Sequence, residues 1–151
     1  MTRFAALVTL VAVLLPLKAE ALTCITRGSE IQQVERAYAT SNAVFSAFVE
    51  STATLVTPDG SAAAGVKLRV MQVWKGTLHP GDTVTAFADE DYPFAGGSYA
   101  APVGSGMLVY AAGLEPYVLG ACGRSGVLHS RTQDIPLLNR LSQKPEFKLG
   151  R

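Results

Sequence analysis

Five short apolar segments, separated by residues that favour turns, constrain the fold of this chain more than any other feature. They carry the β-branched, aromatic or alternating residues that are typical of strands. Turn residues such as Pro58-Asp59-Gly60 and His79-Pro80-Gly81 lie between them, and short connections of this kind favour antiparallel neighbours. The predicted strands cover residues 43–50, which can run on toward 56, and then 66–74, 83–88, 107–112 and 117–122.

Two helices are predicted at the ends of this strand series. Ser29 and Gln32 have the spacing of a capping box, and apolar residues follow at helical intervals, which predicts a helix over about 30–39. A second helix is predicted over about 132–142, with Thr132 as a candidate cap and Pro136 within the first turn. Five strands with a helix at each end predict a mainly β domain built on a small antiparallel barrel.

Two segments between the strands are predicted to be loops. Residues 61–65 are all small, and residues 89–106 are rich in glycine and also carry two prolines. Asp89-Glu90-Asp91 opens the second loop with three adjacent carboxylates, whereas calcium loops usually alternate acidic residues with spacers. A solvated loop is the simpler interpretation of this triplet, and contact with a basic partner is the alternative.

The N-terminal residues have the pattern of an export signal. Arg3 precedes an uncharged apolar run over 4–17, and Ala19-Glu20-Ala21 provides a cleavage motif, so residues 1–21 are predicted to be a signal peptide. The run is shorter than the ~20 residues of a spanning helix, which makes a retained membrane anchor the alternative. A lipid-modified Cys24 is a second alternative.

Cleavage after Ala21 predicts a secreted or periplasmic protein with no membrane span. A single domain is then expected over 22–144, followed by a flexible tail over 145–151.

The charge of the chain argues against nucleic acid as a partner. The sequence has 13 basic and 12 acidic residues, and loss of the signal peptide would leave eleven of each. A neutral chain does not attract nucleic acid by long-range charge. Trp74-Lys75-Gly76 is therefore interpreted structurally: Trp74 closes one end of the barrel, and Gly76 permits the turn that follows.

The two cysteines, Cys24 and Cys122, lie near opposite ends of the predicted domain. In an oxidising compartment they are predicted to form a disulfide. Closing a loop of about a hundred residues would stabilise the fold by roughly 4–5 kcal/mol in the chain-entropy model. Because the Cys-x-x-Cys spacing of redox motifs is absent, the predicted role is structural.

No residue pattern predicts catalysis, a metal site or a cofactor. His79 and His129, the two histidines, lack neighbours with zinc-ligand spacing, and surface roles are expected for both. Gly96-Gly97-Ser98-Tyr99-Ala100 imitates a nucleophile elbow, but neither a strand before it nor a helix after it is predicted. The chain is therefore predicted not to be an enzyme, with a serine hydrolase centred on Ser98 kept as an alternative.

Four segments in a fixed order carry a resemblance to a known family. They are Ser41-Asn42-Ala43-Val44-Phe45, Val70-Met71-Gln72-Val73-Trp74-Lys75-Gly76, Gly104-x-Gly106-Met107-Leu108-Val109-Tyr110-Ala111 and Ala121-Cys122-Gly123-Arg124-Ser125. Over about residues 24–141 the chain resembles bacterial secreted proteins related to the tissue inhibitors of metalloproteinases, which belong with netrin-like domains. The resemblance implies a five-stranded OB-type barrel.

The resemblance also implies how the N-terminus is held. Members of the family typically begin with Cys-x-Cys, and each of these cysteines is bridged to the barrel. Here Leu22-Thr23-Cys24 occupies that start, and the loop over 89–106 has no cysteine, so one bridge is absent. The remaining bridge corresponds to Cys24 and Cys122.

Two functions follow from the resemblance. The leading one is a non-catalytic module that binds an unidentified protein through its N-terminal segment and the loop over 89–106. The alternative is a metalloprotease inhibitor in which Leu22, Thr23 and Cys24 form the edge that contacts the protease. In the animal inhibitors, the first residue chelates the protease zinc through its backbone. With Leu22 untethered, ordering it on binding would cost about 1–2 kcal/mol.

Overall fold

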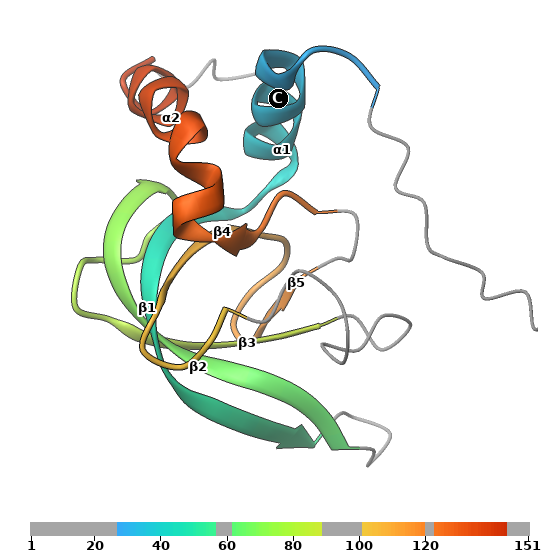
Figure 1. The fold of residues 1–151 in the computed structure, drawn as a ribbon, viewed down its shortest axis with the longest axis vertical. Coiled ribbons are helices and arrows are strands. Elements are labelled where there is room, and N and C mark those ends of the chain that lie inside the picture. Colours follow the sequence, from blue (N-terminus) through green and yellow to red (C-terminus); the bar gives the residue numbers. More distant parts are fainter. Residues whose placement is uncertain (1–26, 57–61, 89–100, 120–122, 145–151) are drawn as a thin grey trace, which may run out of the picture.

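The computed structural model describes residues 27–56, 62–88, 101–119 and 123–144 (Figure 1). Over these residues the fold is mainly β: six strands form one sheet that curls into a half-barrel, and helices cover one end of it. In chain order the elements are α1 (Glu30–Thr40), β1 (Ala43–Val56), β2 (Ala62–Lys75), β3 (Thr83–Ala88), β4 (Gly106–Ala111), β5 (Tyr117–Leu119), β6 (Gly126–Val127), the 3-10 helix η1 (Leu128–Asp134) and α2 (Ile135–Ser142).

The strands follow the order β5-β3-β2-β1-β4-β6. Neighbouring strands are antiparallel, as predicted, except that β3 and β5 are parallel. An isolated bridge between Ala112 and Val118 also joins the end of β4 to β5. The two-residue strand β6 adds a sixth strand to the five that were predicted, and it is too short to leave a periodic pattern in the sequence.

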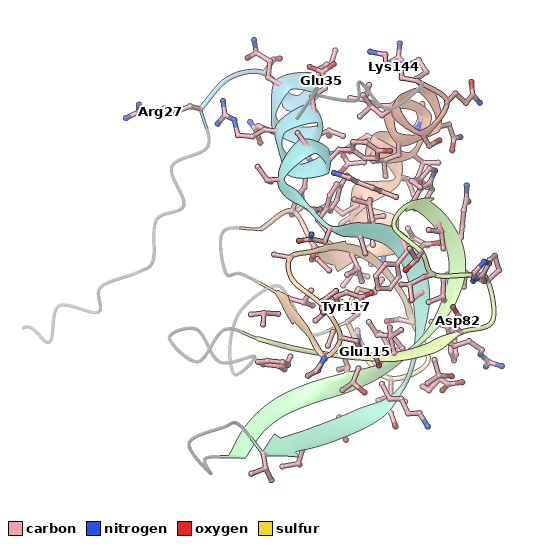
Figure 2. The ribbon with its side chains drawn as sticks, turned by 180° about the vertical axis from the view of Figure 1, so that it is seen from behind. Arg27, Glu35, Asp82, Glu115, Tyr117 and Lys144 are labelled. Carbon is pink, nitrogen blue, oxygen red and sulfur yellow. The ribbon has the colours of Figure 1, made fainter. Side chains whose placement is uncertain are left out.

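The inner face of the curled sheet holds the main hydrophobic core. Phe45, Ala47 and Val49 alternate along β1 and are fully buried there. The ring of Phe45 lies 5.8 Å from that of Tyr117 on β5, whose side chain points into the curl (Figure 2). The other large buried members of this core include Leu68, Val84, Met107, Val109 and Leu119.

A second core lies between the sheet and the two helices. From the strands it contains Val44, Trp74, Leu108 and Tyr110, and from the helices Val34, Leu137 and Leu138. Strand β4 contributes alternate residues to both cores, so this apolar strand is covered on both faces. The helices are therefore packed onto the outer face of the sheet near one end (Figures 1 and 2).

The hairpin formed by β1 and β2 is longer than predicted. Strand β1 continues to Val56, and β2 begins at Ala62, so the prediction of a loop over 61–65 is wrong for residues 62–65. The small side chains there give no apolar alternation, but their backbone pairs with β1 from Ala53 to Val56. Cross-strand pairing thus imposes a conformation that the local sequence does not reveal.

The first helix begins where the sequence predicts it, whereas the second begins later than predicted. Ser29 and Gln32 form both halves of the predicted capping box at the start of α1. The second helix begins at Ile135 rather than near 132, with Pro136 in its first turn as expected. Thr132 is not its cap, because residues 128–134 form a 3-10 helix in which the Thr132 hydroxyl faces the His129 carbonyl.

Candidate functional site

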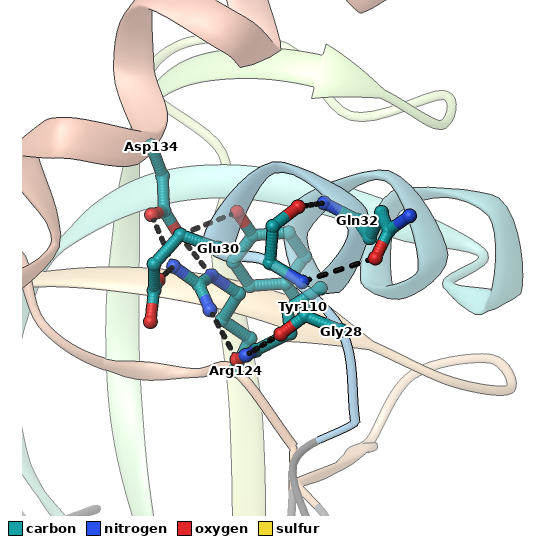
Figure 3. A network of polar contacts seen from close by, with 8 residues as sticks. Gly28, Glu30, Gln32, Tyr110, Arg124 and Asp134 are labelled. Atoms are coloured by element: carbon teal, nitrogen blue, oxygen red, sulfur yellow. Dashed lines mark hydrogen bonds and ion pairs between the residues drawn. The ribbon is translucent and has the colours of Figure 1, made fainter.

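Arg124 is the centre of a buried polar cluster that joins three parts of the chain (Figure 3). It lies between β5 and β6, and its side chain is only 8 % exposed. Its partners are Asp134 at the end of η1 and Glu30 and Gln33 on α1. These four residues, together with Tyr110, are called the Arg124 cluster below.

Asp134 pairs with Arg124 through two parallel hydrogen bonds. The Arg124 Nε donates to Oδ2 at 2.7 Å, and Nη2 donates to Oδ1 at 2.8 Å. This bidentate geometry is the strongest that a guanidinium and a carboxylate adopt. The side chain of Asp134 is fully buried, so loss of Arg124 would leave an uncompensated charge in the interior.

Tyr110 brings strand β4 into the cluster. Its hydroxyl donates to Asp134 Oδ2 at 2.9 Å, and its backbone N–H donates to the Ser125 hydroxyl at 2.8 Å. Burial, followed by the nearby negative charge of Asp134, raises the pKa of the Tyr110 hydroxyl far above its usual range. Tyr110 is therefore a neutral donor at every physiological pH.

Helix α1 contacts the cluster through its first turn. Arg124 Nη2 donates to Glu30 Oε2 at 2.5 Å, and Nη1 donates to Gln33 Oε1 at 3.2 Å. Gln33 also donates through Nε2 to the Gly28 carbonyl, just before the helix. The start of α1 is thus held against the segment that leads into β6.

The charges in the cluster determine what it can do chemically. The hydrogen bond from Arg124 to Asp134 raises the pKa of the Arg124 guanidinium, so this side chain stays protonated. The guanidinium donates hydrogen bonds to the carboxylates of Asp134 and Glu30 and to the side-chain amide of Gln33. Asp134 accepts three hydrogen bonds in all, two from Arg124 and one from Tyr110. Such an arrangement holds α1, η1 and the segment before β6 together.

A second set of polar contacts fastens the helices to the end of β2. The indole N–H of Trp74 donates to Asn139 Oδ1 on α2 at 2.7 Å, and the Tyr38 hydroxyl donates to the Trp74 carbonyl. Lys75 donates to the Tyr38 carbonyl and lies 5.2 Å from the centre of the Tyr38 ring. Trp74 is buried beneath both helices on the outer face of the sheet, in a core separate from the one inside the curl.

The predicted turn after Trp74 is confirmed by the backbone of Gly76. Its φ is +105°, in the region that favours glycine, and a Cβ there would meet the Ala43 side chain at 3.2 Å. The next turn carries His79, which is exposed as predicted and whose backbone N–H donates to Asp82 Oδ2. His129 is exposed in η1.

Most residues that the sequence suggested for function lie outside the described residues. This is true of both cysteines, of the Leu22 and Thr23 edge, of the acidic triplet and of Ser98. Within the described ranges, no three histidine, cysteine or acidic side chains come together where they could hold a metal ion. In the same ranges, no helix has the length and apolar character needed to cross a membrane.

Sequence reasoning did not identify the Arg124 cluster. In the sequence, Arg124 belongs to one of the family motifs, and Tyr110 and Asp134 lie within a predicted strand and a predicted helix. The one available signal was the position of polar Tyr110 in the otherwise apolar strand over 106–111. Neither protein-family models nor curated protein sequences yield a match to this chain.

Proposed function

We propose that the protein is an exported, non-catalytic protein-binding module of the netrin-like type, related to the tissue inhibitors of metalloproteinases. The proposal includes a five-stranded OB-type barrel, to which β6 is an addition. Two features support that barrel: the parallel pairing of β3 with β5, and the bridge between Ala112 and Val118, which links β5 toward β4. The proposed barrel has the strand order 1-2-3-5-4.

The observation that carries the proposal is the contact between Glu30 and Arg124. Cys24 precedes Glu30 by six residues, and Cys122 precedes Arg124 by two. Six residues can span up to roughly 20 Å and two up to roughly 7 Å, so the contact leaves the cysteines within bonding reach. A Cys24–Cys122 disulfide would then reinforce the connection that the Arg124 cluster already makes.

This connection supports a binding role for the N-terminal segment. A binding segment gains affinity when its base is held in place, because less conformational freedom is lost on association. The Arg124 cluster holds the start of α1, and Arg27, an exposed residue just before the helix, is the first described residue after the segment (Figure 2). The partner is proposed to contact this segment and the loop over 89–106, in which Val103 is exposed.

Site-specific photo-cross-linking in cells that export the protein tests this proposal. A photoreactive residue replaces Arg27 or Val103 in two variants, and the exposed Met71 on β2 in a control. We expect positions 27 and 103 to give an adduct of the same partner mass, which position 71 does not give. Absence of adducts at 27 and 103, or equal adducts at all three positions, would contradict the proposal.

Metalloprotease inhibition is the second candidate, because the Glu30–Arg124 contact also restrains the chain eight residues after Leu22. That restraint partly replaces the family bridge that this chain lacks. N-terminal sequencing of the exported protein must then give Leu22 as the first residue. Titration against a panel of metalloproteases should show inhibition that is lost when the terminal amine is acetylated. Any other first residue excludes inhibition by zinc chelation.

A further inference from the structure

The outer half of the β1–β2 hairpin extends beyond the rest of the sheet (Figure 1). Strand β4 pairs with β1 only over Ala43–Phe48, and β3 pairs with β2 only over Gly65–Arg69. The last backbone bonds on the β4 side join Val49 to Gly104 and Ser105. Residues 51–56 therefore pair on one side with residues 62–67 of β2, and on the other side with no strand among the residues that the structure describes. Residues 51–56 and 62–64 are called the arm below.

The free edge of β1 in the arm is an open template for another strand. Its outward N–H and C=O groups face no strand of the described chain, and such groups attract an additional extended backbone. Exposed edges are usually protected by lysine or proline, but residues 51–56 contain neither. Thr52, Thr54 and Val56 are exposed and β-branched, and Val56 is 77 % exposed.

The sequence of this edge suits a second copy of itself. In an antiparallel pair related by a two-fold axis through the sheet, one residue faces its own copy. Centred on Thr54, this arrangement places Thr54 opposite Thr54 and Thr52 opposite Val56, and such β-branched pairs are favourable. Residues 51–56 carry no charge, so two copies meet without like-charge repulsion. Next to this segment, Glu50 is paired with Arg69, and Lys67 lies opposite Ser51 on the other side of β1.

We propose that the protein forms a two-fold dimer by pairing the free edge of β1 with the same edge of a second copy. The two arms then make one continuous four-stranded sheet. Six residues per copy bury less surface than the ~1,200 Å² of a typical stable interface, so association is weak and depends on concentration. This proposal is independent of the protein-binding function proposed above.

Charge variants of Thr54 test the dimer directly. Sedimentation velocity of the oxidised, exported protein is measured from about 10 μM to about 1 mM, the range in which small interfaces associate. We expect association in the wild type, and association about ten-fold weaker in both Thr54→Lys and Thr54→Glu, because each variant opposes like charges. An equimolar mixture of the two should restore it. Thr77→Lys, at an exposed threonine outside the arm, is the control and should associate like the wild type.

Hydrogen exchange provides a second readout that does not depend on the variants. We expect some amides within 51–56 to become more protected as the concentration of the wild type rises, while the amides of 43–48 stay unchanged. A wild type that remains monomeric up to ~1 mM would overturn the proposal and leave the edge to a strand of another protein. Association that is as strong in the Thr54→Lys and Thr54→Glu variants as in the wild type would also overturn it. So would a mixture of the two variants that does not associate.

Discussion

Strands β1 and β2 lie in opposite environments at their two ends. The helix-covered end, where β1 runs from Ala43 to Val49, is buried on both faces and flanked by β4, and the Trp74–Asn139 hydrogen bond joins β2 to α2 there. The arm, at the other end of the same two strands, has no further strand beside β1 among the described residues. The two ends of this hairpin thus differ in role. The covered end packs against the two helices, and along the arm the outer edge of β1 has backbone N–H and C=O groups that face no described strand.

The difference indicates that this hairpin is stabilised by the helices and strands that pack against it. At the covered end, most residues of β1 contribute apolar burial in addition to their ladder hydrogen bonds. In the arm the exposed residues contribute little beyond the ladder itself, and isolated hairpins are only marginally stable. Substitutions should therefore have large effects at the covered end and small effects in the arm.

The largest effect is expected for Arg124→Met. The change leaves Asp134 buried without its cation, so the free energy of unfolding should fall by about 3–5 kcal/mol in denaturant titrations. The double variant Arg124→Met with Asp134→Leu removes both charges and should recover much of this loss. A single variant that loses less than about 1 kcal/mol, or a double variant no better than the single one, would contradict the role of the cluster.

A smaller effect is expected for Asn139→Leu. It removes the acceptor of the Trp74 indole N–H, which lies beneath the helices, and should cost about 1–3 kcal/mol in the same titrations. The neighbouring Arg140 is exposed, so Arg140→Leu is the matched control and should stay within about 0.5 kcal/mol. Equal losses in the two variants would show that the indole bond does not fasten α2.

Tyr110→Phe should cost about 0.5–1.5 kcal/mol at neutral pH, because it removes one hydrogen bond to Asp134. The raised pKa of Tyr110 gives this loss a pH dependence. Its stabilising contribution is complete below the ordinary tyrosine pKa of 10.0 and declines above it, because the unfolded chain then releases a proton that the folded protein keeps.

The stability of the wild type relative to Tyr110→Phe should therefore fall above pH 10 by about 1.4 kcal/mol per pH unit. Unfolding titrations of both proteins at several alkaline pH values measure this slope. Parallel pH profiles for the two proteins would mean that Tyr110 does not hold its proton in the folded state.

The smallest effect is expected in the arm. Thr52→Ala removes an exposed side chain, so the free energy of unfolding of the monomer should change by no more than about 0.5 kcal/mol. The measurement is made at low micromolar concentration, where self-association does not contribute. A loss above 1 kcal/mol would show that the arm is covered and would remove the contrast with the helix-covered end.

The sequence predicted the covered end of the fold better than the arm. Alternation along 66–72, the apolar run of β4 and the capping box are local patterns, and each places its residues correctly. The small residues 62–65 form a strand only because β1 lies beside them. Strand β6 and the 3-10 helix η1 likewise depend on tertiary contacts that no local pattern encodes.

The Arg124 cluster could not be predicted for the same reason. Glu30 and Arg124 are 94 residues apart in the chain, and nothing in their immediate surroundings marks them as partners. The expected disulfide and N-terminal edge rested on composition, compartment and family resemblance, and they lie outside the described residues. The cluster nevertheless joins the start of α1 to Arg124, a contact that the sequence does not predict.

Peptide mapping of the exported protein without reduction tests most directly whether the two ends of the domain are joined. The thiols are blocked first, the protein is digested, and the fragments are identified by mass. We predict one linked fragment that contains Cys24 and Cys122 of the same chain, and no blocked cysteine. Two blocked cysteines, or a link only between separate chains, would contradict the account of an N-terminal segment anchored beside the Arg124 cluster.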